Sequence, residues 1–133
     1  MTYLLDTSAF TGLMKEDPHV RAWLSALNPE DHVVICTIVE GEVIYGIAKL
    51  TEGKRRSELR EKAHTLFEAI PCEAVPVSAA SHYAEIKLHR QRSGLTLDEN
   101  DLWIAATARS LGAVLVTRDS DFTGIDNLAV IAP

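Results

Sequence analysis

The chain has 133 residues, of which 47% are hydrophobic and 24% are charged, the usual balance of one soluble globular domain. This length leaves no room for a second domain, so we predict a single domain over residues 1–133. The 13 Lys and Arg against 19 Asp and Glu give a net charge of −6, which argues against a broadly basic nucleic-acid-binding surface but allows a local basic patch. No apolar run approaches the roughly 18 residues of a membrane span, and no cationic leader precedes one, so we predict a cytoplasmic protein without membrane contact.

Short apolar runs alternate along the chain with segments of helical periodicity. In chain order, the predicted strands are Tyr3–Leu5, Val33–Cys36, Ala74–Val77, Ala113–Thr117 and Ala129–Ile131. The predicted helices are Ser8–Lys15, His19–Leu27, Ile38–Leu50, Arg55–Ala69, Ala79–Gln91 and Leu97–Leu111. This alternation is typical of a parallel sheet covered by helices on both faces. We therefore predict an α/β fold, a three-layer α/β/α sandwich with a mainly parallel, short-stranded sheet.

Two carboxylates follow predicted strands. Asp6 comes directly after the first strand, and Asp119 comes shortly after the strand Ala113–Thr117. In parallel sheets, ligands bind beyond the carboxyl ends of the strands, near the point where the strand order reverses. Each residue also has a simpler role, because an Asp at such a position caps the helix that follows. The sequence leaves both roles open.

Glu42 is the third candidate. Thr37 and Glu40 form the T-x-x-E pattern of a capping box, so helix-end chemistry accounts for Glu40 but not for Glu42. Glu42 lies beside an apolar stripe, and Gly46 four residues later opens the space next to it. Glycine costs about 1 kcal/mol relative to alanine inside a helix, so its presence suggests close approach by another group. The alternative is a partly exposed Glu at the edge of the stripe.

Asp101 is the fourth candidate. Thr96 and Glu99 give a second capping-box pattern, and the helix macrodipole favours Asp98 and Glu99 in a first helical turn. Asp101 instead belongs to the predicted buried face of this helix, together with Leu97, Ile104, Ala105, Ala108 and Leu111. An acid on a buried face must be protonated, paired or bound to a cation.

The predicted fold brings the four acids, Asp6, Glu42, Asp101 and Asp119, toward one pocket. Several carboxylates brought together repel one another unless a divalent cation neutralises them, and hard oxygen ligands suit Mg²⁺ or Mn²⁺. Oxygen-only sites that leave several positions of the ion to water typically serve phosphate chemistry. The residues therefore point to phosphodiester hydrolysis.

Four stretches, in this order, resemble motifs of PIN-domain nucleases, most closely those of the VapC-like ribonuclease toxins of toxin-antitoxin pairs. They are Leu4-Leu5-Asp6-Thr7-Ser8, Glu42-Val43-Ile44-Tyr45-Gly46, Asn100-Asp101-Leu102-Trp103-Ile104-Ala105-Ala106-Thr107-Ala108 and Leu115-Val116-Thr117-Arg118-Asp119-Ser120-Asp121-Phe122. The resemblance covers essentially the whole chain. It implies that the catalytic, metal-binding residues are Asp6, Glu42, Asp101 and Asp119. The auxiliary residues are Asp121, Thr7, Thr117 and Asp98.

The resemblance further implies a metal-dependent endoribonuclease that uses one or two Mg²⁺ or Mn²⁺ ions and leaves 5′-phosphate and 3′-hydroxyl ends on RNA. Asp6 and Asp101 are the first candidates for direct ligands, whereas Glu42 and Asp119 act directly or through waters. A homodimer and a small antitoxin that covers the active-site groove are also implied. The five histidines fall outside the four motifs, so we assign them no catalytic role.

Basic side chains near two predicted helices are candidate phosphate contacts. The tentative RNA-binding set is Lys49, Arg55, Lys87 and Arg90. A solvated helix surface explains each of them equally well. Without the four acids the net charge of −6 becomes −2, and two divalent ions would make it +2, so a metal-bound site need not repel RNA.

We predict that Trp23, Tyr45 and Trp103 pack in the core or an interface rather than against bases, although Trp103 departs from the aliphatic residue usual at that family position.

Four alternatives compete with a toxin. The nearest is a PIN nuclease that matures or trims RNA without an antitoxin. A phosphoacceptor receiver domain expects adjacent acids after the first strand and a Lys after a late one, where this chain has Asp6-Thr7-Ser8 and Thr117-Arg118. A haloacid-dehalogenase-type phosphatase expects the second Asp of D-x-D-x-T, which is absent after Asp6. A degenerate binding module does not explain why all four carboxylates are present.

Overall fold

Five short strands form one fully parallel sheet in the order β3-β2-β1-β4-β5. The computed structural model describes residues 1–133. The strands are β1 (Thr2–Leu5), β2 (His32–Cys36), β3 (Cys72–Glu73), β4 (Val114–Val116) and β5 (Val130–Ile131). The helices are α1 (Thr7–Met14), α2 (Pro18–Ser25), α3 (Thr37–Ala48), α4 (Lys54–Ala69), α5 (Ala79–Arg92), α6 (Glu99–Leu111) and a 3₁₀ turn, η1 (Ser120–Phe122). The predicted α/β class with a parallel sheet is confirmed.

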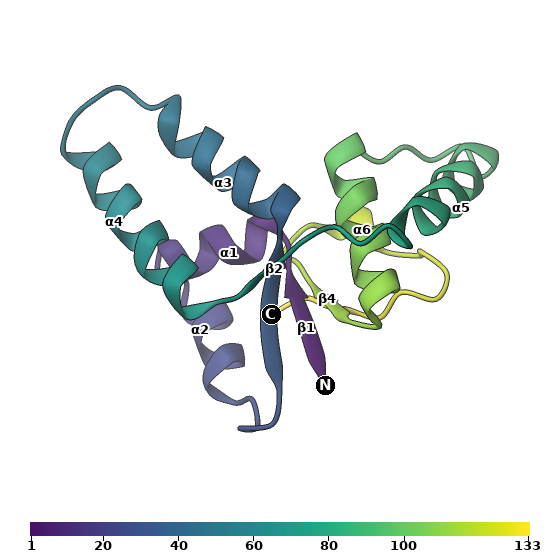
Figure 1. The fold of residues 1–133 in the computed structure, drawn as a ribbon, viewed down its shortest axis with the longest axis horizontal. Coiled ribbons are helices and arrows are strands. Elements are labelled where there is room, and N and C mark those ends of the chain that lie inside the picture. The colour runs from purple at the N-terminus through teal and green to yellow at the C-terminus, as the bar shows by residue number, and fades with distance from the viewer.

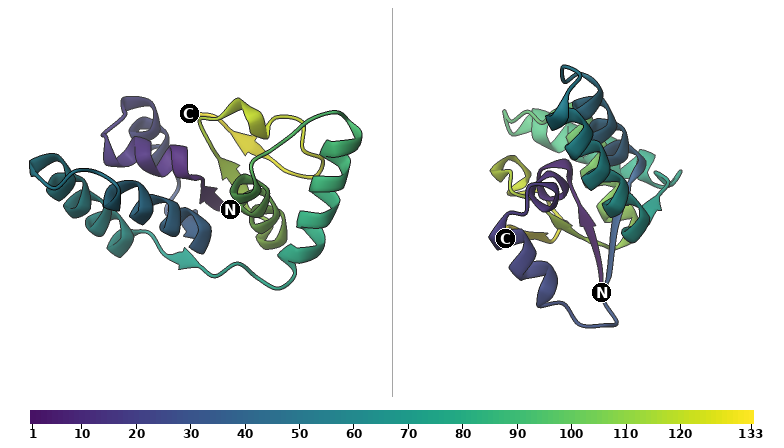
Figure 2. Two further views of the ribbon diagram at one scale, coloured as in Figure 1. Left: turned by 90° about the horizontal axis from the view of Figure 1, so that it is seen from above. Right: turned by 90° about the vertical axis from the view of Figure 1, so that its left-hand side faces the viewer.

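Helices cover both faces of the sheet. In Figure 1, α1 to α4 lie on one side of the strands, and α5 and α6 lie on the other. Helices α3 and α4 pack side by side as an arm, and the view from above in Figure 2 shows the same layers. The predicted three-layer arrangement is therefore confirmed. None of these helices has the length and apolar character needed to cross a lipid bilayer.

Strand β1 lies at the centre of the sheet, and the chain crosses from one half to the other through α5 and α6, between β3 and β4. Strands β2 and β3 extend outward on one side of β1, and β4 and β5 extend on the other. Leu5 pairs with Val116, and the Asp6 N–H donates to the Val116 carbonyl over 3.0 Å, so β1 and β4 end at the same level. The residues that follow these strands thus lie side by side at the edge where parallel sheets bind ligands.

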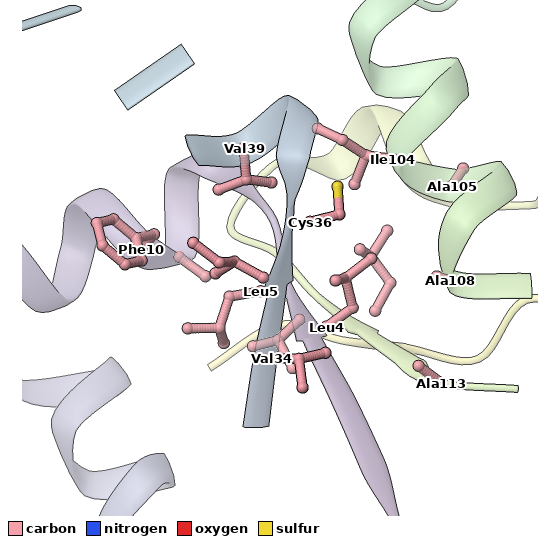
Figure 3. Packing of buried hydrophobic residues seen from close by; sticks show 14 of the residues in the cluster. Leu4, Leu5, Phe10, Val34, Cys36, Val39, Ile104, Ala105, Ala108 and Ala113 are labelled. Atoms are coloured by element: carbon pink, nitrogen blue, oxygen red, sulfur yellow. The ribbon is translucent and has the colours of Figure 1, made fainter. Parts of the chain in front are cut away.

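The core fills the space between the sheet and both helical layers (Figure 3). Successive side chains of a strand point to opposite faces, and Leu4 and Leu5 are both fully buried. On one face, the buried ring of Phe10 stacks on Phe67 with centroids 5.2 Å apart, which joins α1 to α4. On the other face, α6 presents several buried alanines, whose small side chains let this helix pack closely on the strands.

The predicted strand at Ala74–Val77 is wrong in position, because β3 ends before it begins. Pro76 has no N–H with which to continue a strand ladder. Its carbonyl accepts a hydrogen bond from the Ala79 N–H at 2.9 Å, which starts the turn into α5. Val77 is 94% exposed, so its apolar character does not place it in the core.

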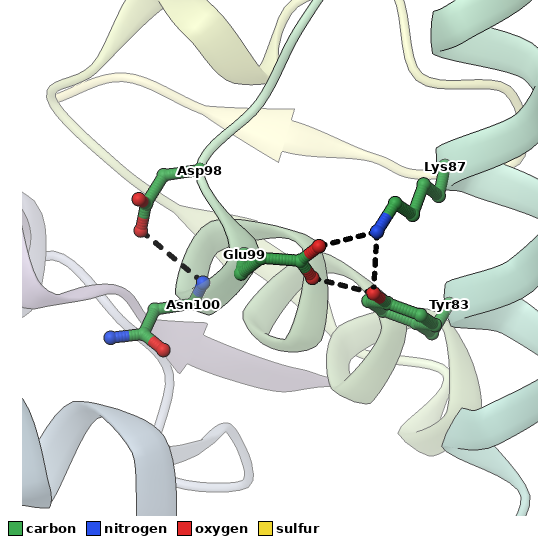
Figure 4. Close-up of polar contacts among 5 residues, drawn as sticks. All are labelled: Tyr83, Lys87, Asp98, Glu99 and Asn100. Carbon is green, nitrogen blue, oxygen red and sulfur yellow. Dashed lines mark hydrogen bonds and ion pairs between the residues drawn. The ribbon is translucent and has the colours of Figure 1, made fainter.

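Both predicted capping boxes are also wrong. Helix α3 already includes Thr37, so this residue is not in the position that caps the helix. Helix α6 begins at Glu99 and is capped by Asp98, one residue earlier. Glu99 accepts hydrogen bonds from Lys87 and Tyr83 of α5 instead of closing a capping box (Figure 4).

Candidate active site

Asp6 and Thr117 meet at the carboxyl ends of β1 and β4. Asp6 is only 3% exposed. Its Oδ1 accepts from the Ala9 N–H at 2.8 Å and the Ser8 hydroxyl at 2.7 Å, and its Oδ2 accepts from the Thr117 hydroxyl. Burial raises the pKa of Asp6, and these hydrogen bonds oppose the rise. Asp6 caps α1, which is one of the two roles that the sequence left open. Its carboxylate is also held in a fixed position at the ends of β1 and β4, where the strand order reverses.

Glu42 projects from α3 toward α1 and α6. Its Oε1 accepts from the Thr7 hydroxyl at 2.5 Å, and its Oε2 accepts from the Asn100 side-chain amide at 3.3 Å. The carboxylate is therefore oriented by two other helices and is not a freely solvated side chain at the edge of a stripe. No atom lies within 4 Å of the position that a Cβ of Gly46 would take, so the close approach predicted there is not made by this chain.

Asp101 is half-buried in the first turn of α6. Burial raises its pKa to about 7, with further contributions from the charges of Glu42, Asp98, Asp119 and Asp6. A carboxyl group with this pKa is only partly ionised at neutral pH. This fits the expectation that Asp101 needs a proton, a partner or a cation.

Asp119 lies on the loop between β4 and η1. Its side chain accepts from the Asp121 N–H at 2.9 Å, and its own N–H donates to the Thr117 hydroxyl at 2.9 Å. These bonds fix the loop to the end of β4. The neighbouring Arg118 donates to Asp17 over 2.8 Å, so its positive charge is already paired.

The four predicted acids line one open groove of about 530 Å³. None of the lining side chains is hydrophobic, and they are Asp6, Thr7, Ser8, Thr11, Glu42, Asp101, Arg118 and Asp119. The fold thus brings together acids that are spread over more than a hundred positions of the sequence. Four carboxylates against one paired guanidinium leave an excess of negative charge in the groove.

This donor set fits a hydrated divalent cation better than a closed metal cage. No three His, Cys, Asp or Glu side chains stand close enough together to enclose an ion as a ready-made cluster. Mg²⁺ usually binds through one or two carboxylates and keeps several waters, which suits spaced carboxylates around an open groove. Burial and the neighbouring carboxylates raise the pKa of Asp101, and a bound cation would favour its ionised form.

The predicted auxiliary residues divide into two pairs. Thr7 and Thr117 contact Glu42 and Asp6, respectively, through their hydroxyls. Asp98 and Asp121 do not line the groove. Asp98 caps α6, and Asp121 is an exposed residue of η1 whose backbone N–H holds Asp119.

The four tentative RNA-binding residues differ in their availability. Lys49 and Arg55 are exposed. Lys87 is bonded to Glu99, and this contact raises the pKa of the amine (Figure 4). Arg90 is only 6% exposed and its guanidinium donates to backbone carbonyls. The expectation that Arg90 contacts phosphate is therefore withdrawn, because its donors lie inside the protein.

Arg90 instead ties two segments of the site to each other. Its Nη2 donates to the carbonyls of Thr96 at 3.3 Å and Asp121 at 3.1 Å, and its Nη1 donates to the Thr123 carbonyl at 3.4 Å. Thr96 precedes α6, whereas the other two carbonyls belong to the region of η1. A buried cation of α5 thus fixes the start of the helix that carries one acid against the loop that carries another.

Several residues in or beside the groove were not singled out from sequence. Ser8 donates to Asp6 and accepts from the Arg118 N–H at 2.9 Å. A Ser two residues after an Asp is a recognisable local hydrogen-bonding pattern and could have indicated this role. Thr11 and Asn100 carry no comparable signal, because their places in the site depend on the packing of α1 and α6.

The predicted aromatic packing is confirmed for the two tryptophans but not for the tyrosine. Trp103 stacks on Tyr83 with centroids 4.1 Å apart, and Trp23 packs edge-on against Tyr3 at 5.3 Å. Tyr45 is 67% exposed and does not lie in the core, so only the interface part of its prediction stays open.

Replacing Asp101 by Asn should stabilise the metal-free protein above neutral pH. The fold raises the pKa of this carboxyl from 3.8 to about 7, so ionisation lowers the stability of the folded state progressively between these two pH values. Asn does not ionise. With a chelator present, the wild type and Asp101→Asn should unfold at the same temperature near pH 4. At pH 8 the unfolding midpoint of the variant should be higher by roughly 3 °C. The difference is small because water in the open groove weakens the destabilising effect of the ionised Asp101.

The matched control is Glu30→Gln, which alters an exposed carboxylate outside the groove and should gain no such pH-dependent stability. An equal difference between the wild type and Asp101→Asn at both pH values would contradict the unbalanced charge at Asp101.

Known proteins resemble this chain over nearly its full length. Residues 3–128 match the PIN domain family. Ribonuclease VapC1 of Haemophilus influenzae (strain R2866) is 34% identical over 134 residues, which cover 96% of this chain and 95% of that protein. A chain in the crystal structure of VapBC2 from Rickettsia felis bound to a promoter DNA fragment matches with a TM-score of 0.88 and 26% identity, over 98% of each chain. VapBC-5 from Mycobacterium tuberculosis, a member of the VapBC family of toxin-antitoxin systems, matches with a TM-score of 0.79 and 26% identity, over 99% of this chain and 98% of that one. With its parallel sheet and its acidic groove, this chain belongs to the PIN-domain family.

Proposed function

We propose that this chain is a divalent-metal-dependent endoribonuclease and the toxin of a toxin-antitoxin pair. The observation that carries the proposal is the meeting of Asp6, Glu42, Asp101 and Asp119 in one groove of a PIN-domain chain. Similarity to a protein named ribonuclease VapC1 supports RNA as the substrate, and likeness to VapBC-5 supports the toxin role. The proposed products carry 5′-phosphate and 3′-hydroxyl ends. On the resemblance alone, we also propose a homodimer that acts in the cytoplasm.

One or two Mg²⁺ or Mn²⁺ ions would occupy the acidic groove. Asp6 and Asp101 are the proposed direct ligands, and Glu42 and Asp119 would act directly or through waters. When bound, the ion supplies positive charge that activates a water molecule and stabilises the leaving oxygen. The spacing of the acids around an open groove leaves room for the waters and for an RNA phosphate.

Neutral hydroxyls keep two of the carboxylates in place for this task. Ser8 and Thr117 bond to Asp6, and Thr7 bonds to Glu42. Because a hydroxyl carries no net charge, it orients a carboxylate without cancelling its attraction for a cation. A lysine or arginine in the same position would compete with the ion. Lys49 and Arg55 are exposed and stay proposed phosphate contacts, as does the partly engaged Lys87.

Incubation of a panel of RNAs with the purified chain tests the activity. We expect cleavage with Mg²⁺, none with EDTA, and a rate at least about 100-fold lower for Asp6→Asn and for Asp101→Asn, because each loses a charge that holds the ion. Analysis of the fragment ends should find 5′-phosphate and 3′-hydroxyl groups. Asp126→Asn, outside the groove, should cut RNA like the wild type.

Cleavage that continues in EDTA and in both substituted proteins would contradict a metal-dependent site at these acids. A wild-type chain that leaves every RNA of the panel intact, with either Mg²⁺ or Mn²⁺, would contradict the proposed ribonuclease.

An apolar groove on the α3–α4 arm supports a protein partner. It has about 250 Å³ and is lined by Ile44, Ile47, Ala48, Ala63 and Phe67, together with Arg60 and His64. Ile44 is 54% exposed, although it is a large hydrophobic residue. Exposed apolar grooves between helices are typical docking sites for an apolar helix face. We propose that the antitoxin binds here and extends toward the acidic groove.

Ala48→Glu tests this partner site. Expression of the wild type should arrest growth of a bacterial host, and co-expression of a small protein encoded beside it should restore growth. Glu is compatible with a helix but places a charge in the apolar groove, so Ala48→Glu should stay toxic and no longer be neutralised. Growth of each strain gives the readout, with Asp101→Asn as the non-toxic control.

Neutralisation of Ala48→Glu as effective as that of the wild type would place the partner elsewhere. Unimpaired growth with the wild-type chain alone would favour the RNA-processing nuclease without an antitoxin.

A further inference from the structure

A second groove adjoins the acidic groove on the α3 side. It also has about 530 Å³, and its lining includes Thr37, Gly41, Tyr45 and Lys49. Thr7 and Glu42 line both grooves. Because the Glu42 carboxylate is bonded to Thr7 on one side and to Asn100 on the other, it forms a fixed ridge between them. The two grooves therefore meet at Thr7 and Glu42.

Tyr45 provides an exposed aromatic face in the second groove. The side chain is 67% exposed, whereas other rings of the chain are used within the fold, as Tyr83 and Trp103 are in their stack. The Lys49 ammonium group lies over the Tyr45 ring, 5.3 Å from its centroid, and Lys49 is the residue that caps the C-terminus of α3. The groove therefore presents a largely exposed aromatic ring with a positive charge held over it.

We propose that Tyr45 and Lys49 form a binding subsite for one unpaired nucleotide of the RNA, next to the acidic groove. Proteins hold single-stranded RNA by stacking its bases on aromatic side chains and by placing cations near its phosphates. Tyr45 stacks on the base, and Lys49 contacts the adjoining phosphate. This inference rests on the proposed ribonuclease function and adds to it a residue-level contact that selects single-stranded over paired RNA.

The helix surface beside Tyr45 is open enough for a flat base. Gly41 lies one turn before Tyr45, and no atom stands within 4 Å of the position that a Cβ would take there. Gly41 leaves the helix backbone uncovered, so a planar ring approaches Tyr45 without meeting a side chain at this position.

The polar character of the groove favours RNA over a second copy of this chain. Of its nine lining residues, two are hydrophobic, and the lining includes Thr7, Thr37, Asn100, Glu42 and Lys49. The cores of protein interfaces are depleted in Lys and Glu. Hydroxyl, amide and ammonium groups around a single aromatic ring instead match the edges, phosphate and π face of a nucleotide.

Binding of labelled single-stranded RNA, measured by fluorescence anisotropy with Mg²⁺ present, tests the subsite. The cleavage site is first mapped with the wild type. All proteins used for binding carry Asp101→Asn, which slows cleavage of the RNA during the measurement. A series of oligonucleotides replaces one nucleotide at a time around that site by an abasic residue. One abasic position should weaken binding by about 5- to 100-fold, the range for loss of one stacked base.

Tyr45→Ala should bind intact RNA more weakly than the parent protein by the same factor. Its affinity should not fall further when the RNA carries that one abasic position. Tyr45→Phe retains the ring and should bind as tightly as the parent protein. Lys49→Gln should reduce the dependence of log affinity on log salt by about one unit, as expected for loss of one phosphate contact. Leu88→Ala, which changes an exposed apolar residue of α5, should have no effect.

Two results would overturn the subsite without touching the nuclease assignment. In the first, RNA is cut by the wild type, but Tyr45→Ala binds every oligonucleotide like its parent. In the second, Tyr45→Ala weakens the binding of every oligonucleotide equally, whichever position is abasic, and sedimentation shows that the variant is a monomer where the parent protein is a dimer. The groove at Tyr45 would then be a contact between two subunits. Failure of the wild type to bind or cut any RNA would reject the proposed function together with the subsite.

Discussion

Repulsion among carboxylates is the constraint to which the rest of the structure responds. The parallel sheet delivers Asp6 and Asp119 to the ends of adjacent strands, while α3 and α6 bring Glu42 and Asp101 from opposite helical layers (Figure 1). Burial, together with the charges of the neighbouring carboxylates, raises the pKa of Asp101 to about 7, so holding this acid ionised in the folded protein costs free energy. A hydrated divalent ion would remove the cost and attract phosphate at the same time.

The scaffold withholds positive charge from the groove. Arg118 lines it but is paired with Asp17, and the buried Arg90 directs its guanidinium at backbone carbonyls. Hydroxyl groups, such as those of Thr7 and Thr117, do the work of orienting the acids. Because neither arginine pairs with the four carboxylates, these acids stay available to an ion. The arginines therefore have structural roles, whereas an exposed cation such as Lys49 is available to contact RNA.

The sequence predicted the parts of this site that depend on local pattern. Asp6 and Asp119 follow short apolar runs, so the rule for strand ends located them, and Asp101 stood out as a charge on an apolar helix face. The two-residue β3 escaped this reasoning because the apolar run after it contains Pro76, which cannot extend a ladder. The burial of Arg90 was missed as well, since it depends on loops that lie about thirty residues further along the chain. The exposure of Tyr45 likewise depends on how the α3–α4 arm projects, which no local pattern specifies.

Anomalous diffraction from crystals soaked in Mn²⁺ would reveal whether these acids share one cation site. We expect an anomalous peak in the acidic groove, within direct ligand distance of Asp6 and Asp101, that disappears in crystals of Asp101→Asn. A groove without a peak at saturating Mn²⁺, or a peak bound by other residues, would contradict this expectation.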